Sequence, residues 1–388
     1  MLFLLYINNI FAFFQDLYTN TSNCIYEIVH LLVHADDATL IASTRALVVR
    51  KLSDLLHYCG LNCIIPQYSK CKFIVINGDD DDKNSLPFGN KFLEPAPHLE
   101  LLGSHLSATG LLAEDLNLHM KERYKSCIKY FNFLRANRLA PLIVKTKVLK
   151  ACVVNSLLTN CEAFGSCIPK DLEKTYMKLL RCTFNLRSNT PILTLFIESG
   201  FLPIRALIIA RQLKWFLRYK DGLVGDTPRV QLFNRLLNEP TDYIQHYIDI
   251  CEKYSCVKEV YSEAAESMKS RVREFADKGQ YKYKMYTEMN PSLQKSKFVD
   301  NANPISEDVI RFRLGSHLLP IETGRWARIS RENRLCTVCG VLGDERHAVY
   351  QCSEVDRTGL TLSEPWSSLW NDDGVYTLFR NLRVAKLL

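Results

Sequence analysis

Residues 28–43 of the chain read IVHLLVHADDATLIAS. An apolar run rich in β-branched residues meets two adjacent acids, Asp36 and Asp37, and resumes at Ala38. Runs of this length, broken at one polar point, predict two short strands joined by a tight turn. We therefore expect a β-hairpin with Asp36 and Asp37 at its tip.

This acidic pair has two chemical interpretations. At an effective dielectric of about 20, two carboxylates about 4 Å apart repel each other by roughly 4 kcal/mol. A divalent cation relieves this repulsion, and Mg²⁺ prefers carboxylate oxygens. Alternatively, the pair forms a solvated turn, because Asp is a common turn residue.

Length and composition are those of a soluble globular protein. The 388 residues are enough for two or three domains. The 14 cysteines are scattered, which favours reduced thiols in the cytoplasm or nucleus over a secreted disulfide framework.

The apolar residues 1–14 lack the basic start of a signal peptide and are too short to span a membrane. We expect a buried helix there, and its abrupt start suggests that an upstream part of the protein is missing.

Up to about residue 110, the pattern that begins with the hairpin predicts a small α+β layer. Apolar spacing predicts a helix over residues 44–61, with Thr44 as its N-cap and Gly60 as its stop. A strand is expected over residues 71–76, and extended segments near 88–93 and 98–106. The four acids at 79–82 between them suit a solvated loop better than a cation site.

From residue 114 the pattern becomes helical. Prolines open further helices at 141, 169 and 203, mixed-charge helices fill residues 222–286, and the polar residues 290–304 suggest a linker. Between 116 and 161 nine basic residues face one acid, Glu122. Such a surface either attracts phosphates or is only a solvated face. The candidate nucleic-acid contacts are Lys121, Lys125, Lys129, Arg135, Arg138 and Lys145.

Cys336, Cys339, His347 and Cys352 form the pattern C-x2-C-x7-H-x4-C. Three thiols and one imidazole make a complete tetrahedral set for Zn²⁺, so the ion would be structural. The alternative is a buried thiol cluster with a satisfied histidine. Arginines at 311, 313, 325, 328, 331, 334 and 346 surround this segment and suit a phosphate-facing surface.

The order of these pieces resembles the C-terminal part of the reverse transcriptase of a non-LTR, LINE-like retrotransposon. The shared features are LFLLYINN, the Ala-Asp-Asp hairpin, a helix ending in GLN, a Lys-containing turn, an LLG segment, basic helices and the Cys-Cys-His-Cys module. The segments IESGFLPIRA (197–206) and RLGSHLLPIETGRW (313–326) are similar to thumb and tail sequences of that family.

The resemblance implies a truncated palm at residues 1–110, an all-helical thumb at 111–289 and a zinc-knuckle-like region at 290–388. It implies that Asp36 and Asp37 bind catalytic Mg²⁺, that His34, Lys70 and Gly103 lie at the substrate, and that an RNA template and DNA primer are the partners. The family usually has an aromatic residue at the position of His34.

The family's two-metal chemistry needs a further aspartate on an earlier strand, which this chain lacks. Asp16 and Glu27 are the only acids before the hairpin. The resemblance therefore implies a fragment of an RNA-directed DNA polymerase that is inactive alone. The alternatives are a non-catalytic, zinc-dependent nucleic-acid-binding module, or a folded or half-folded fragment without a cellular role.

Overall fold

The computed structural model describes residues 10–17, 31–34, 37–79, 81–222, 233–235, 237–238, 241–360, 362, 366–371 and 374–387. The fold is mixed α+β and mostly helical, as expected. The chain divides into two compact units. Unit 1 comprises Met1–His119, Ala163–Cys167 and Trp215–Cys251, and unit 2 comprises Met120–Glu162, Ile168–Lys214 and Glu252–Leu388. Unit 2 contains both sides of the expected boundary at residue 290.

Up to residue 107, the described part of unit 1 contains two α-helices and three hairpins. The strands pair only with their sequence neighbours, giving three separate two-stranded antiparallel sheets among the described residues. Their bounds are α2 (Ile10–Leu17), β1 (Leu31–His34), β2 (Asp37–Leu40), α4 (Arg45–Leu61), β3 (Leu86–Phe88), β4 (Lys91–Leu93), β5 (His98–Leu101) and β6 (Ser104–Ser107).

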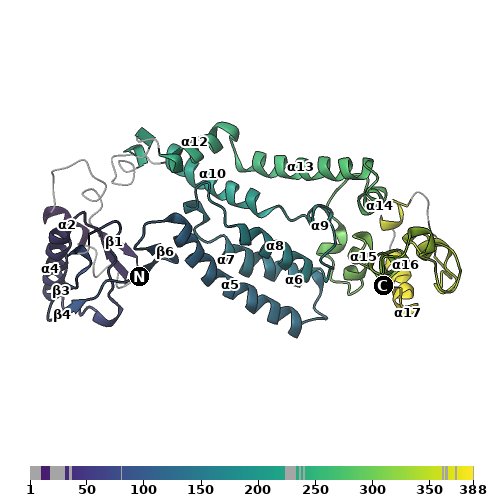
Figure 1. Cartoon of the computed structure of the whole chain (residues 1–388), viewed down its shortest axis with the longest axis horizontal. Helices are drawn as coiled ribbons and strands as arrows, with labels where there is room; N and C mark the ends of the chain where they lie inside the picture. The colour runs from purple at the N-terminus through teal and green to yellow at the C-terminus, as the bar shows by residue number, and fades with distance from the viewer. Residues whose placement is uncertain are drawn as a thin grey trace. The chain divides into compact units, whose positions relative to one another are not determined.

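The decisive hairpin is confirmed. Strand β1 pairs with β2 in the register Leu31 with Leu40 and His34 with Asp37. Helix α4 packs on this hairpin, and Thr44 is its N-cap, accepting a hydrogen bond from the Leu47 amide at 3.2 Å. Figure 1 shows α2 and α4 beside the β1–β2 and β3–β4 hairpins.

The expected strand at residues 71–76 is wrong. Only Phe73 makes a bridge, to Pro95, and no strand forms there. The helix α4 also runs through Gly60 to Leu61 instead of ending at the glycine. The acidic loop is held by Arg45, whose guanidinium donates to the carbonyls of Asn84 (2.6 Å) and Ser85 (2.5 Å).

The principal elements of the described chain from residue 112 onward are helical. They are α5 (Leu112–Ala136), α6 (Leu142–Val148), the π-helical turn η3 (Leu149–Val154), α7 (Asn155–Leu157), α8 (Lys170–Thr183), α9 (Ile192–Ser199), α10 (Ile204–Gly222), α12 (Asp242–Lys253), α13 (Val257–Asp277), α14 (Tyr281–Met289), η5 (Lys297–Asp300), α15 (Ser306–Arg313), α16 (Pro320–Trp326), η6 (Arg331–Asn333), the π-helical turn η7 (His347–Gln351) and α17 (Gly374–Val384).

Helices α5, α6 and α8 pack together in unit 2 (Figure 1). The buried Tyr130 hydroxyl links all three, since it donates to the Lys145 carbonyl at 2.9 Å and lies 2.9 Å from the Thr183 hydroxyl. Pro141 and Pro169 cap α6 and α8, as the proline pattern predicted. The core face of α5 passes through Cys127 and Tyr130, whereas the apolar Ile128 is 60% exposed.

The expected linker at 290–304 is instead packed into unit 2. Leu293, Phe298 and Val299 are each at most 2% exposed, and the Ser296 amide donates to the Glu198 carbonyl at 2.9 Å. Three apolar anchors therefore outweigh the polar composition of this segment.

A buried ion pair joins the two segments singled out at 197–206 and 313–326. The Arg313 guanidinium binds both carboxylate oxygens of Glu198, at 2.6 and 3.0 Å. Tyr286 donates to the same carboxylate at 3.0 Å, and Asn290 donates to the Tyr286 hydroxyl at 3.0 Å. Arg313 is thus committed to the core, which corrects its expected place on a phosphate-facing surface.

Among the described residues, no single helix has the length and apolar composition to cross a membrane. Helices α9 and α10 meet that test only as a pair, with a 55° bend between them.

Candidate metal centre

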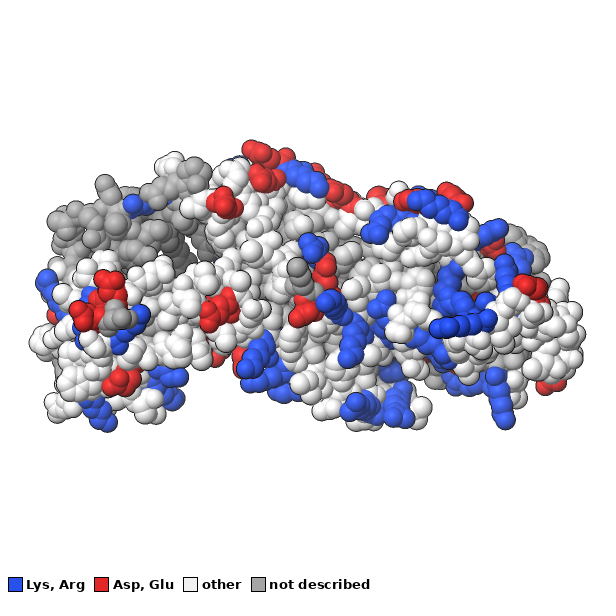
Figure 2. All heavy atoms as spheres, in the orientation of Figure 1, with Lys and Arg blue, Asp and Glu red and all other residues white. Residues whose placement is uncertain are grey.

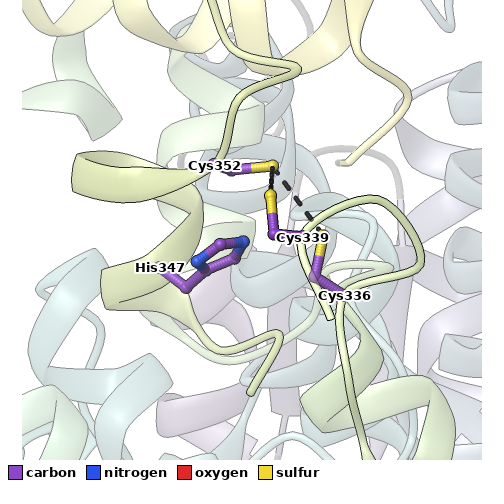
Figure 3. Close-up of side chains that lie close together, drawn as sticks. All are labelled: Cys336, Cys339, His347 and Cys352. Atoms are coloured by element: carbon purple, nitrogen blue, oxygen red, sulfur yellow. Dashed lines mark hydrogen bonds between the residues drawn. The ribbon is translucent and has the colours of Figure 1, made fainter. Parts of the chain in front are cut away.

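The four predicted zinc ligands converge in unit 2 (Figure 3). Cys336 and Cys339 lie on a tight turn closed by two hydrogen bonds, from the Cys336 amide to the Val341 carbonyl (2.7 Å) and from the Gly340 amide to the Cys336 carbonyl (2.9 Å). Gly340 has φ +70°, a conformation that costs glycine little. The C-x2-C spacing and this glycine therefore point both thiols to one side of the turn.

His347 begins the π-helical turn η7, and Cys352 directly follows its last residue. The Asp344 carboxylate accepts from the His347 amide at 2.9 Å and fixes the start of the turn. The wide turn closes where the Cys352 amide donates to the His347 carbonyl at 2.8 Å, five residues back. Because of that spacing, the imidazole and the thiol of one turn lie near the same point.

The distances between the ligand atoms suit a tetrahedral ion. Four thiolates each about 2.3 Å from a zinc ion would lie about 3.8 Å apart. Cys352 Sγ lies 3.9 Å from Cys336 Sγ and 4.0 Å from Cys339 Sγ. All four ligand atoms lie within 4.8 Å of one another. This Cys/His group could therefore hold a zinc ion without rearrangement of the backbone.

His347 distinguishes a metal centre from a satisfied thiol cluster. Its side chain is buried, and neither ring nitrogen has a hydrogen-bond partner in the described structure. Leaving such polar atoms unpaired costs about 1–3 kcal/mol. A bound cation would remove that cost for the nitrogen that faces the three sulfurs.

The protonation of the thiols differs across the site. A hydrogen bond between the Cys339 thiol and the Ser353 hydroxyl, 3.4 Å away, lowers the pKa of Cys339 to about 6. Burial raises the pKa of Cys352 to about 11. Cys339 therefore loses its proton more readily than Cys352, and a bound metal would favour the thiolate form of both.

Arg357 binds the backbone of the turn that follows His347. This arginine was not identified from the sequence. Its guanidinium donates to the carbonyls of Ala348 (2.8 Å), Val349 (2.7 Å) and Cys352 (2.6 Å). These three bonds satisfy carbonyls that the π-helical turn leaves free and place a positive charge near the thiolates. An arginine five residues after the last cysteine carries no spacing signal of its own.

The predicted magnesium and substrate residues lie in unit 1. Asp36 is outside the described residues. Asp37 opens β2 and is exposed, and His34 closes β1 opposite it. Lys70 ends the short helix η1 (Tyr68–Lys70) and is exposed. Gly103 forms the β5–β6 turn with φ +78°, and its carbonyl lies 3.2 Å from His119 Nδ1.

Most of the predicted nucleic-acid contacts are exposed. Lys121, Lys125 and Lys129 lie on one face of α5, and Arg135 and Arg138 follow at its end. Figure 2 shows Lys and Arg side chains gathered over the region of α5, α6 and α8.

Lys145 does not belong to this surface. It is 5% exposed, and its ammonium donates to the Glu307 carboxylate (2.7 Å) and the Arg138 carbonyl (3.0 Å). A phosphate cannot reach it without unpacking α6, so the structure corrects this prediction.

The described cysteines are free thiols. Comparison of the chain with protein-family models, with curated proteins and with solved structures gave no match.

Proposed function

We propose that the chain is a nucleic-acid-binding protein whose C-terminal part is held by a structural Zn²⁺ ion. The observation that supports the binding function is the row of exposed lysines on α5, Lys121, Lys125 and Lys129, four residues apart. Helical geometry puts the three ammonium groups on one face. Their spacing of about 6 Å along the axis is of the order of the separation between phosphates on a strand.

Nearby acids do little to cancel this charge. Glu122 pairs with Lys125 at 2.5 Å, but the lysine side chain is 66% exposed, so the pair is weak and open to competition from a phosphate. By contrast, α13 alternates Lys and Arg with five acidic residues. The two long helices therefore differ in charge pattern. Lysine-to-glutamine changes at α13 can serve as the matched control for the same changes on α5.

The test is a salt titration of binding to a labelled DNA duplex. Changing Lys121, Lys125 and Lys129 together to Gln should reduce the slope of log K against log salt by about 0.9 for each phosphate that the variant no longer neutralises. Changing Lys258, Lys269 and Lys278, in or just after α13, to Gln removes the same charge and should leave the slope unchanged. Equal effects of the two triple variants would show that the α5 face has no special role.

The zinc part of the proposal rests on the buried, unpaired His347 and the sulfur spacing. Native mass spectrometry should find one zinc ion per chain, absent from Cys352→Ser. Cys182→Ser, at an exposed thiol on α8, is the matched control and should keep the ion. A folded, metal-free chain would refute the assignment.

A second candidate function is the polymerase origin that the resemblance implies. The observation that favours it is the β1–β2 hairpin, whose second strand begins at Asp37. Because Asp16 and Glu27 are the only acids before the hairpin, we expect the 388-residue chain to give no Asp37-dependent DNA synthesis on a primed RNA template with Mg²⁺. Synthesis that is abolished by Asp37→Asn would instead make the chain an active polymerase.

A further inference from the structure

Two adjoining hollows in unit 2 form a cleft that the proposed function does not use. The first, of about 250 Å³, lies between the start of α14, α16 and η6, and the second is about 310 Å³. Asn189 lines both. Their volumes are near the lower end of small-ligand sites, about 300 Å³.

The first hollow is positively charged. Lys282, Arg325, Arg331 and Arg334 line it against one acid, Glu322. Glu322 is already paired with Lys282 at 3.0 Å and with Arg325 at 2.7 Å. An anion that enters this hollow therefore meets an excess of positive charge.

The guanidinium groups in this hollow differ in availability. Arg334 donates to the carbonyls of Ile321 (3.0 Å) and Ile329 (2.9 Å), so it holds the backbone. Arg331 lies 4.5 Å above the ring of Tyr281 and forms no ion pair with a described carboxylate. Its planar fork of N–H donors is thus available for a phosphate.

The second hollow carries a flat aromatic surface. Trp326 ends α16 and is 36% exposed, and the Arg187 guanidinium lies 3.5 Å from its ring centroid. A tryptophan stacked on a guanidinium is the type of surface on which unpaired nucleobases stack. Trp326 follows Arg325 in the chain, so the stacking surface adjoins the phosphate-binding groups.

We propose that this cleft binds one unpaired nucleotide of a single-stranded nucleic acid. Arg325 and Arg331 contact its phosphate, and its base stacks on the Trp326–Arg187 pair. A base inside a duplex is stacked on its neighbours and cannot reach such a surface, so the cleft selects single strands. The inference rests on the proposed nucleic-acid-binding function and adds a site separate from the α5 face.

The test compares binding of a labelled oligothymidylate and of a blunt duplex by fluorescence anisotropy. Trp326→Ala should weaken binding of the single strand about 5- to 100-fold and leave duplex binding within about twofold. Trp326→Tyr keeps a stacking ring and should retain most of the affinity. Because Trp326 is partly exposed, both variants should stay folded, which circular dichroism checks.

A separate variant tests the proposed phosphate contact of Arg331. Arg331→Gln should lower the salt slope for the single strand by about 0.7. Lys258→Gln removes the same charge from an exposed position on α13 and should leave the salt slope for the single strand unchanged.

The outcomes separate this inference from the proposed function. If Trp326→Ala has no effect, or weakens single strand and duplex equally, the cleft is not a nucleotide site, although the α5 face still binds duplex. If single-strand binding depends on Trp326 while the α5 triple variant behaves as wild type, the cleft stands and the α5 proposal fails. If the wild-type chain binds neither nucleic acid, both are overturned.

Discussion

At the scale of single residues, the Glu198–Arg313 pair stabilises unit 2. Both side chains are at most 5% exposed, and Tyr286 supplies a further hydrogen bond. Removing one partner leaves the other charge buried and unpaired, which costs roughly 3–5 kcal/mol. Glu198→Ala should lower the free energy of unfolding by about that amount in urea denaturation.

The matched control is Glu173→Ala. Glu173 pairs with Arg205 at 2.5 Å, but the arginine is 56% exposed, and exposed pairs contribute about 0–1 kcal/mol. If both variants were destabilised equally, the buried network would not hold the two segments together.

At the scale of elements, the N-cap of α4 is a second test. Thr44 has extended backbone angles, and its hydroxyl satisfies an amide at the start of the helix. Thr44→Ala should reduce the free energy of unfolding of unit 1 by about 1 kcal/mol. Ser53→Ala, at an exposed position within α4, should not reduce it, and a loss of stability there would mean that the cap is not the cause.

Elements whose signals are local were predictable from the sequence. The β1–β2 hairpin follows from apolar runs around a polar point, α4 from its cap and period, and the Cys/His group from the C-x2-C-x7-H-x4-C spacing. Each depends on residues close together in the chain.

Elements set by distant partners were not predictable. Lys145 is buried because Glu307, 162 residues away in sequence, pairs with it. Residues 290–304 are polar overall but pack through Phe298 and Val299. Helix α9 is buried at every position from Leu193 to Ser199, so it has no solvent-exposed face to give a clear helical period.

At the scale of the whole molecule, the two units should respond differently to metal removal. The Cys/His group joins the Cys336–Cys339 turn to η7, and this module meets α16 where the Ile321 amide donates to the Gly343 carbonyl at 3.0 Å. These ligands and this hydrogen bond lie within unit 2, whereas α4 belongs to unit 1. The stability of α4 should therefore not depend on the ion.

Zinc binding contributes roughly 10–16 kcal/mol in isolated zinc-finger peptides, so removal of the ion should open the module locally. After chelation, hydrogen exchange measured by mass spectrometry should quicken over residues 334–357, while residues 45–61 of α4 keep their protection. Cys352→Ser should show the same pattern without chelator, and Cys182→Ser should resemble wild type. If zinc leaves and residues 334–357 remain protected, the thiols and Arg357 alone hold this module, and the ion is not structural.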